Sequence, residues 1–176
     1  DKCDLPLSMK ELTDALNKTD SKTSSGSDGL GYAFYKVFWR ETRTLVLNSM
    51  NKSMRSRLLP TSQRLGLISM IPKGTKDRRF LQHWRPICLL NCWYKLLSSA
   101  LATRLEAALQ EVISKDQTGF LRSRFINENN LITHEVLEYS KKHRKRGLLL
   151  CIDFSKAFDS LDHQFIKDTL KYLGFG

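Results

Sequence analysis

Cysteine, histidine and long apolar runs are scarce or scattered in this chain, and each absence excludes a class of protein. The four cysteines and four histidines follow no regular spacing, and Cys88 and Cys92 have no second pair that would complete a zinc site. We therefore expect free thiols and a reducing intracellular compartment. We expect the protein in both the nucleus and the cytoplasm. No apolar run is long enough to cross a bilayer, so we expect no membrane partner.

Acidic residues are also in short supply, because 29 lysines and arginines stand against 18 aspartates and glutamates, for a net charge of +11. A strongly basic protein attracts polyanions, so nucleic acid is the first partner to expect. An acidic membrane surface would come second, but no basic amphipathic helix carries an aromatic face suited to lipid, so we do not expect it. Hydrophobic residues make up 41% of the chain, which argues against wholesale disorder. A length of 176 residues suits one domain, or one domain and part of a second.

Local patterns predict a mixed fold. Ser8 and Glu11 form a capping-box pattern, which predicts a short helix through about Leu16. Apolar spacing predicts further helices over residues 32–59, 92–113, 127–142 and 163–173. Two apolar runs, 65–71 and 87–90, flank a basic loop and predict a hairpin, and the run 147–152 predicts a buried strand. The predicted fold class is therefore α/β, of the α+β kind: helix-rich with a β-hairpin, then a strand and a helix.

Asp153 directly follows the last apolar run. A carboxylate at the end of a buried strand is held by a rigid element and still faces solvent, a placement typical of metal-dependent phosphoryl chemistry. Taken by itself the pattern favours a simpler interpretation, in which Asp153 opens a turn and Asp159 or Ser160 caps the next helix.

Five segments, taken in their order along the chain, change that balance. They are residues 25–30, 68–73, 84–90, 116–120 with Arg124, and 152–159. Together they resemble the motifs of reverse transcriptases, in the form carried by LINE-type (non-LTR) retrotransposons, with group II intron maturases next. Residues 25–30 and 117–124 look more like the LINE branch. The resemblance implies an N-terminal fragment, with a helix and loop at 1–30, a fingers subdomain at 31–146 and the start of the palm at 147–176.

For the active site, the resemblance implies that Asp153 is the catalytic carboxylate and a ligand of Mg²⁺, with the backbone carbonyl of Phe154 as a further ligand. Phe158 would lie against the sugar of the incoming nucleotide and reject a 2′-hydroxyl, unless it is an ordinary core aromatic. Lys73 and Arg85 would bind the triphosphate of the dNTP, although basic residues in loops are more often simply solvated.

For the template, the resemblance implies a track lined by Gly119, Phe120 and Arg124, through close backbone approach, stacking and phosphate contact, with Gln117 fixing the loop by hydrogen bonds. Arg104, near the apolar stripe of its helix, is interpreted either as a structural arginine or as a functional one. The basic run 141–146 has three interpretations: a nucleic-acid contact, a nuclear-localisation patch, or a solvated turn.

The resemblance therefore implies part of an RNA-directed DNA polymerase that binds an RNA template, a DNA primer and dNTPs. In the family, the remaining magnesium ligands are a pair of adjacent aspartates. No Asp-Asp dipeptide occurs in this sequence, so we expect this chain alone to be inactive. The alternative is a non-catalytic RNA-binding or scaffold module derived from such an enzyme. Nothing in the sequence indicates an oligomeric state.

Overall fold

The computed structural model describes residues 3–121 and 124–175. The chain divides into two compact units, Asp1–Leu105 (unit 1) and Glu106–Gly176 (unit 2). The subdomain boundaries predicted after residues 30 and 146 come from the family resemblance and stay predictions. The described residues combine helices with one small antiparallel sheet, which confirms the predicted α+β class.

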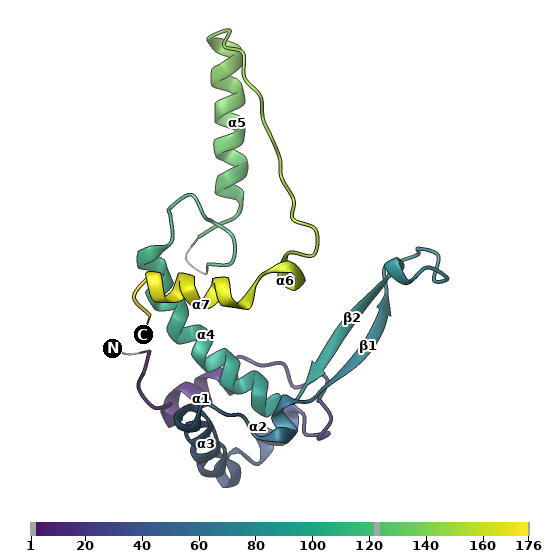
Figure 1. The fold of residues 1–176 in the computed structure, drawn as a ribbon, viewed down its shortest axis with the longest axis vertical. Helices are drawn as coiled ribbons and strands as arrows, with labels where there is room; N and C mark the ends of the chain where they lie inside the picture. Colours follow the sequence, from purple (N-terminus) through teal and green to yellow (C-terminus); the bar gives the residue numbers. More distant parts are fainter. Residues whose placement is uncertain (1–2, 122–123, 176) are drawn as a thin grey trace. The chain divides into compact units, whose positions relative to one another are not determined.

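Unit 1 is built from helices and a hairpin (Figure 1). Its elements are α1 (Met9–Asn17), α2 (Tyr32–Val37), α3 (Trp39–Ser56), the 3₁₀ turns η1 (Thr61–Arg64) and η2 (Leu81–His83), β1 (Gly66–Pro72), β2 (Trp84–Leu90), and the start of α4 (Cys92–Val112). The predicted capping box forms: the Ser8 backbone N donates to Glu11 Oε2 at 2.8 Å, and the Glu11 N donates to Ser8 Oγ at 3.3 Å.

The long helix predicted over 32–59 is in fact two helices. The backbone leaves the helical region at Phe38, with φ −101° and ψ 24°, so α3 starts in a new direction. Trp39 then donates its Nε1 to Thr13 Oγ1 at 3.0 Å, which ties the start of α3 to α1. No glycine or proline marks this break, so the apolar pattern could not locate it. Past the break, α3 ends at Arg57 in a left-handed conformation, before Pro60.

The core of unit 1 lies where α1, α2, α3 and the start of α4 meet. Its fully buried side chains are Leu12, Leu16, Met50, Cys92 and Leu96. These side chains recur at helical spacing, so each helix buries one stripe and leaves its other faces in water.

Asn91, only 1% exposed, joins three segments at the base of the hairpin. Its Nδ2 donates to Ser62 O at 3.1 Å, and its Oδ1 accepts from the backbone N of Asp28 at 3.3 Å. Gly26 packs so closely here that a Cβ would lie 2.5 Å from the Asn91 backbone N. The loop before α2 is thereby held against the junction of β2 and α4.

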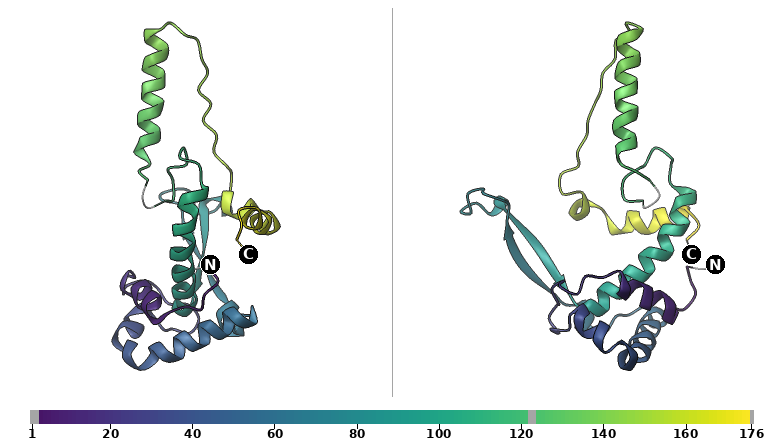
Figure 2. Two further views of the ribbon diagram at one scale, coloured as in Figure 1. Left: turned by 90° about the vertical axis from the view of Figure 1, so that its left-hand side faces the viewer. Right: turned by 180° about the vertical axis from the view of Figure 1, so that it is seen from behind.

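The hairpin forms as predicted, with β1 and β2 paired from Gly66 opposite Leu90 to Pro72 opposite Trp84. It projects away from the helices of unit 1 in Figure 1 and in the right-hand view of Figure 2. Both of its faces are therefore largely exposed, including Ile68 at 71%.

Unit 2 contains the end of α4, a loop, α5 (Asn127–Lys142), an extended segment, the short α6 (Ala157–Ser160) and α7 (His163–Tyr172). The predicted ranges of α5 and α7 match to within one residue. The residue that caps α7 is Asp162, whose Oδ1 accepts from the Gln164 N at 2.7 Å. Asp159 and Ser160 instead lie within α6, so the cap predicted at one of them was wrong.

The strand predicted over 147–152 was also wrong as an element of this structure. The segment is extended and runs beside α5 (Figure 2), but β1 and β2 are the only strands among the described residues. Its side chains are open to solvent, with Leu148 at 91% and Ile152 at 72% exposure. A strand needs a neighbour to pair its backbone N–H and C=O groups, and no described segment pairs with this one. The apolar composition of this segment indicated its extended conformation, but it could not show whether a neighbouring strand would pair with it.

None of the helices in the described residues is long and apolar enough to cross a membrane.

Candidate functional site

The hairpin of unit 1 brings Lys73 and Arg85 to one face. In an antiparallel pair, residues opposite each other share a face, as do residues two apart on one strand. Arg85 lies opposite Ile71, and Lys73 comes two residues after Ile71. The backbone N of Lys73 donates to His83 O at 2.7 Å, which extends the ladder by one pair. The two predicted triphosphate ligands are therefore diagonal neighbours on the same face.

The environments of these two cations differ. The Lys73 Nζ donates to Gln82 O at 2.8 Å within the hairpin tip. Arg85 is exposed, and its guanidinium makes no hydrogen bond or ion pair with any described residue. Of the two, Arg85 is thus immediately free to bind an anion.

The tip between the strands is ordered by its own contacts. Arg79 forms an ion pair with Asp77 at 2.7 Å, and this exposed arginine lowers the pKa of the Asp77 carboxyl. The Trp84 Nε1 donates to Arg78 O at 2.8 Å. The tip is therefore a basic turn held by its own hydrogen bonds, and its Arg79 is already paired with a carboxylate.

In unit 2, Arg124 closes the loop that follows α4. Its guanidinium donates to three backbone carbonyls, those of Ile113 at 3.0 Å, Gln117 at 2.6 Å and Ser114. These carbonyls lie just beyond the C-terminal end of α4, where unpaired acceptors favour a cation. Arg124 thus holds the loop in shape, and its predicted contact with template phosphate stays a prediction.

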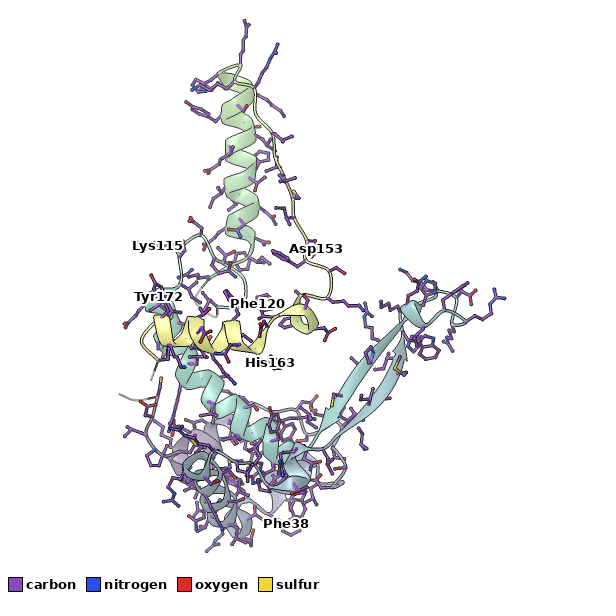
Figure 3. All side chains as sticks on the ribbon, in the orientation of Figure 1. Phe38, Lys115, Phe120, Asp153, His163 and Tyr172 are labelled. Carbon is purple, nitrogen blue, oxygen red and sulfur yellow. The ribbon has the colours of Figure 1, made fainter. Side chains whose placement is uncertain are left out.

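The loop held by Arg124 presents Phe120 to solvent. Phe120 is 96% exposed and has a left-handed backbone with φ 65°, a conformation that costs a non-glycine residue about 1 kcal/mol. On either side of it, Thr118 and Leu121 are buried and anchor the loop. The Gln117 Nε2 donates to Gly119 O at 3.3 Å, so Gln117 does fix this loop by a hydrogen bond. Figure 3 labels Phe120 on the loop between α4 and α5.

Asp153 and Phe154 lie on the exposed segment that leads into α6, and Phe158 lies within α6. Figure 3 shows Asp153 on the extended stretch before α6, and its side chain makes no hydrogen bond with any described residue. Phe154 is 77% exposed and Phe158 is 86% exposed. Phe158 is therefore not a core aromatic of the structure described, and its ring is available for contact.

Asp153 does not fit a complete metal site with its present neighbours. Across residues 3–121 and 124–175, no three His, Cys, Asp or Glu side chains come close enough together to hold an ion. Asp153 therefore belongs to no group of three such ligands among these residues, and a two-ion centre needs several acidic ligands together.

Arg104 has a structural role in unit 1. Its Nη2 donates to Glu11 Oε2 and to Pro6 O, each at 2.8 Å, and its Nε pairs with the other carboxylate oxygen of Glu11. The hydrogen bond from Arg104 is the largest cause that lowers the pKa of Glu11 to about 2, and Ser8 adds to it. The arrangement fastens the chain before α1 to α4 and settles the two interpretations of Arg104 in favour of the structural one.

Sequence reasoning missed Asn91 as the hub beneath the hairpin. It also missed Lys95, whose Nζ donates to Ser24 O at 2.9 Å. Asn91 lies between β2 and α4, and Lys95 lies in the first turn of α4, two places where polar side chains are common and predict no particular contact. Their contacts become visible only in the structure, where the loop before α2 packs against them.

Comparison with known proteins places the chain in a family. Residues 71–176 match the family described as reverse transcriptase (RNA-dependent DNA polymerase). The chain is 31% identical over its full length to the "Transposon TX1 uncharacterized 149 kDa protein" of Xenopus laevis, of which it covers 13%. It is 36% identical over 74% of its length to the Pol polyprotein from type-2 retrotransposable element R2DM of Drosophila melanogaster, of which it covers 12%.

A third relative, the "Probable RNA-directed DNA polymerase from transposon X-element" of Drosophila melanogaster, is 26% identical over 97% of the chain, which covers 20% of that protein. The chain thus spans between 12% and 20% of the length of these relatives. It belongs to the reverse transcriptase family, and its relatives come from transposons and retrotransposable elements, in agreement with the resemblance to LINE-type (non-LTR) enzymes.

Proposed function

We propose that this chain is part of an RNA-directed DNA polymerase that copies an RNA template into DNA from a DNA primer. The observation that carries the proposal is the family match over residues 71–176, which includes every residue predicted to bind nucleotide, template or metal. The name of the X-element relative describes the same activity for that protein.

Asp153 is the carboxylate that we assign to catalysis. Reverse transcriptases use divalent cations, which when bound would offset charge on the reacting phosphates. Asp153 would contribute one ligand and the Phe154 carbonyl another, and both lie on the exposed segment before α6. Further acidic ligands would have to come from outside the described residues, because these hold no cluster of three.

The hairpin is assigned to the triphosphate of the incoming dNTP. The shared face of Lys73 and Arg85 supports this assignment, because two cations on one face can contact successive phosphates. Arg85 is the stronger candidate, since its guanidinium has no described partner, whereas Lys73 would first exchange its bond to Gln82 O.

Phe120 is assigned to a contact with the template strand, and Phe158 to a contact with the sugar of the incoming nucleotide. Phe120 stands out from a loop whose shape is fixed by Arg124 and Gln117, so its ring is positioned to stack on a template base. The ring of Phe158, exposed on α6, would clash with a 2′-hydroxyl and select deoxynucleotides.

The test is Asp153→Asn in the full-length protein that carries this chain. We expect primer extension on an RNA template to fall at least about a thousandfold, since loss of a metal ligand removes several kcal/mol of transition-state stabilisation. RNA affinity should change less than about twofold, because the substitution adds no positive contact to phosphate. Extension assays with Mg²⁺ and dNTPs, paired with RNA titrations, measure both quantities.

Asp159→Asn is the matched control, because Asp159 is also exposed and lies six residues away on α6. It should retain most of the extension activity. Equal loss in both variants, or full activity in Asp153→Asn, would remove Asp153 from the proposed role. Firm RNA binding without extension by the unmodified full-length protein would favour the non-catalytic RNA-binding module instead.

A further inference from the structure

We propose that the end of α5 is a second nucleic-acid contact, separate from the residues assigned to synthesis. Residues 141–146, Lys-Lys-His-Arg-Lys-Arg, form this surface, which we call the basic cap. Its ligand is the sugar–phosphate backbone of a nucleic-acid strand. The inference rests on the proposed function only in taking nucleic acid as the partner.

The basic cap concentrates the charge of unit 2. Unit 2 holds 11 lysines and arginines and 10 aspartates and glutamates, so it is nearly neutral as a whole. Five of those 11 cations lie within the cap's six residues, and the rest of the unit has more acidic than basic residues. Charge needed only for solubility would be spread over the surface, whereas a local concentration creates a potential that attracts a polyanion.

The cap is a folded structure. The Lys145 N donates to Ser140 O at 2.9 Å and the Arg144 N donates to Lys141 O at 3.2 Å, which is the Schellman pattern of a helix end. The Ser140 Oγ donates to Lys145 O at 2.6 Å and closes the turn. The cations are thus displayed on a helix end and its turn, and a partner that reads the run as an extended peptide would have to unwind them.

The residue at the turn is unfavourable for stability. Arg144 has a left-handed backbone with φ 50°, at the position of the Schellman motif that glycine usually occupies. Cations stabilise the last turn of a helix, but one or two meet that need. Arginine at this position therefore adds a fifth charge at the expense of local stability, as expected of a residue that contacts a ligand.

The cations of the cap are free to bind. All six residues are exposed, and none of them forms an ion pair with a described residue. Within the cap, the His143 ring stacks on Tyr139 at a centroid distance of 4.1 Å, and the Lys145 Nζ lies 5.8 Å from the same ring. These contacts position the side chains without neutralising them.

The test compares two double variants of the 176-residue chain. Lys142→Gln with Lys145→Gln removes two charges from the cap, and Lys167→Gln with Lys171→Gln removes two exposed charges from α7 of the same unit. Affinity for a labelled single-stranded RNA is measured from low to high salt, without dNTPs. The cap variant should bind about tenfold more weakly, and its salt slope should shrink by about 1.4, whereas the α7 variant should change less than about twofold.

Arg144→Gly separates a binding role from a structural one. Glycine suits the left-handed turn, so this variant should melt at a higher temperature than the unmodified chain and yet bind RNA more weakly. Unchanged or tighter RNA binding by Arg144→Gly would overturn the proposal, as would equal losses in the two double variants.

Three further ligands define the partner. Single-stranded DNA and duplex DNA of matched length should show the same relative loss of affinity with the cap variant as the RNA does, because all three nucleic acids have a phosphate backbone. A cap variant that lost binding to acidic lipid vesicles while keeping its affinity for every nucleic acid would overturn the proposal. Extension by the full-length protein is measured separately, so failure here would leave the assignment of Asp153 intact.

Discussion

The helices of unit 1 enclose an apolar core, whereas unit 2 exposes nearly all of its apolar side chains. Among the described residues, every buried apolar side chain except Leu121 belongs to unit 1. Unit 2 instead exposes Leu148 at 91%, Tyr172 at 89% and Phe158 at 86%. Apolar surface of this extent marks regions that contact something else. The residues of unit 1 are thus explained mainly by folding, and those of unit 2 mainly by contact.

The largest expected effect compares one leucine from each unit. Leu96 on α4 is fully buried, so Leu96→Ala should lower the free energy of unfolding of unit 1 by about 3 kcal/mol. Leu150 is 71% exposed, so Leu150→Ala should change stability by less than about 0.5 kcal/mol. Denaturant unfolding followed by native-state hydrogen exchange, which resolves the two units, measures both changes. A loss of similar size in Leu150→Ala would mean that residues 147–152 are buried in solution, and the contrast between the units would fail.

The same contrast decides how much of the fold the sequence could predict. The hairpin, α4 and α5 were predicted because their sequence patterns are local: apolar spacing marks the two helices, and two apolar runs flank a basic turn. The break at Phe38 was missed because no glycine or proline marks it. The strand over 147–152 failed for another reason: strand formation depends on a pairing partner, and pairing is a property of the tertiary structure.

The site was predictable only as a set of residue types. The motifs named Lys73 and Arg85, but the antiparallel register was needed to place them on one face. The motif named Arg124, but only the structure shows that its guanidinium holds the loop carbonyls, and its contact with template phosphate stays a prediction. The sequence shows that a basic side chain is present, but it does not show whether that side chain is already bonded to other parts of the protein.

The second prediction concerns the acid sensitivity of unit 1. Arg104 lowers the pKa of Glu11 to about 2 from an ordinary 4.5, so the folded state favours the ionised carboxylate. This stabilisation is fully present above about pH 4.5 and is lost as the pH falls toward 2. We expect the free energy of unfolding of unit 1 to decrease by about 2 kcal/mol across that window, less than for a fully buried pair because Glu11 is partly exposed. Urea unfolding at a series of pH values measures it.

Arg104→Met is the control for that pH dependence. It keeps much of the side-chain volume but leaves Glu11 without its main partner, so stability at pH 7 should fall by about 2 kcal/mol. The decrease between pH 4.5 and 2 should become much shallower in this variant. An equally steep decrease would show that carboxylates other than Glu11 govern the acid sensitivity. Unit 2 contains neither Arg104 nor Glu11, so it should show no matching effect of Arg104→Met.

The smallest expected effect has the opposite sign and tests whether exposure in unit 2 reflects binding. Phe120 has a left-handed backbone and its ring contributes little to packing, so Phe120→Gly should stabilise unit 2 by about 1 kcal/mol. The same change should weaken binding of single-stranded RNA about tenfold, because a stacking ring is lost. Phe125→Gly is the matched control: Phe125 is also exposed but lacks a positive φ, so glycine there should reduce stability through the entropy of the unfolded chain. Should Phe120→Gly stabilise the unit and leave RNA affinity unchanged, the exposed ring would need another partner. Should it destabilise the unit, Phe120 would pack against protein in solution, and unit 2 would be explained by folding, as unit 1 is.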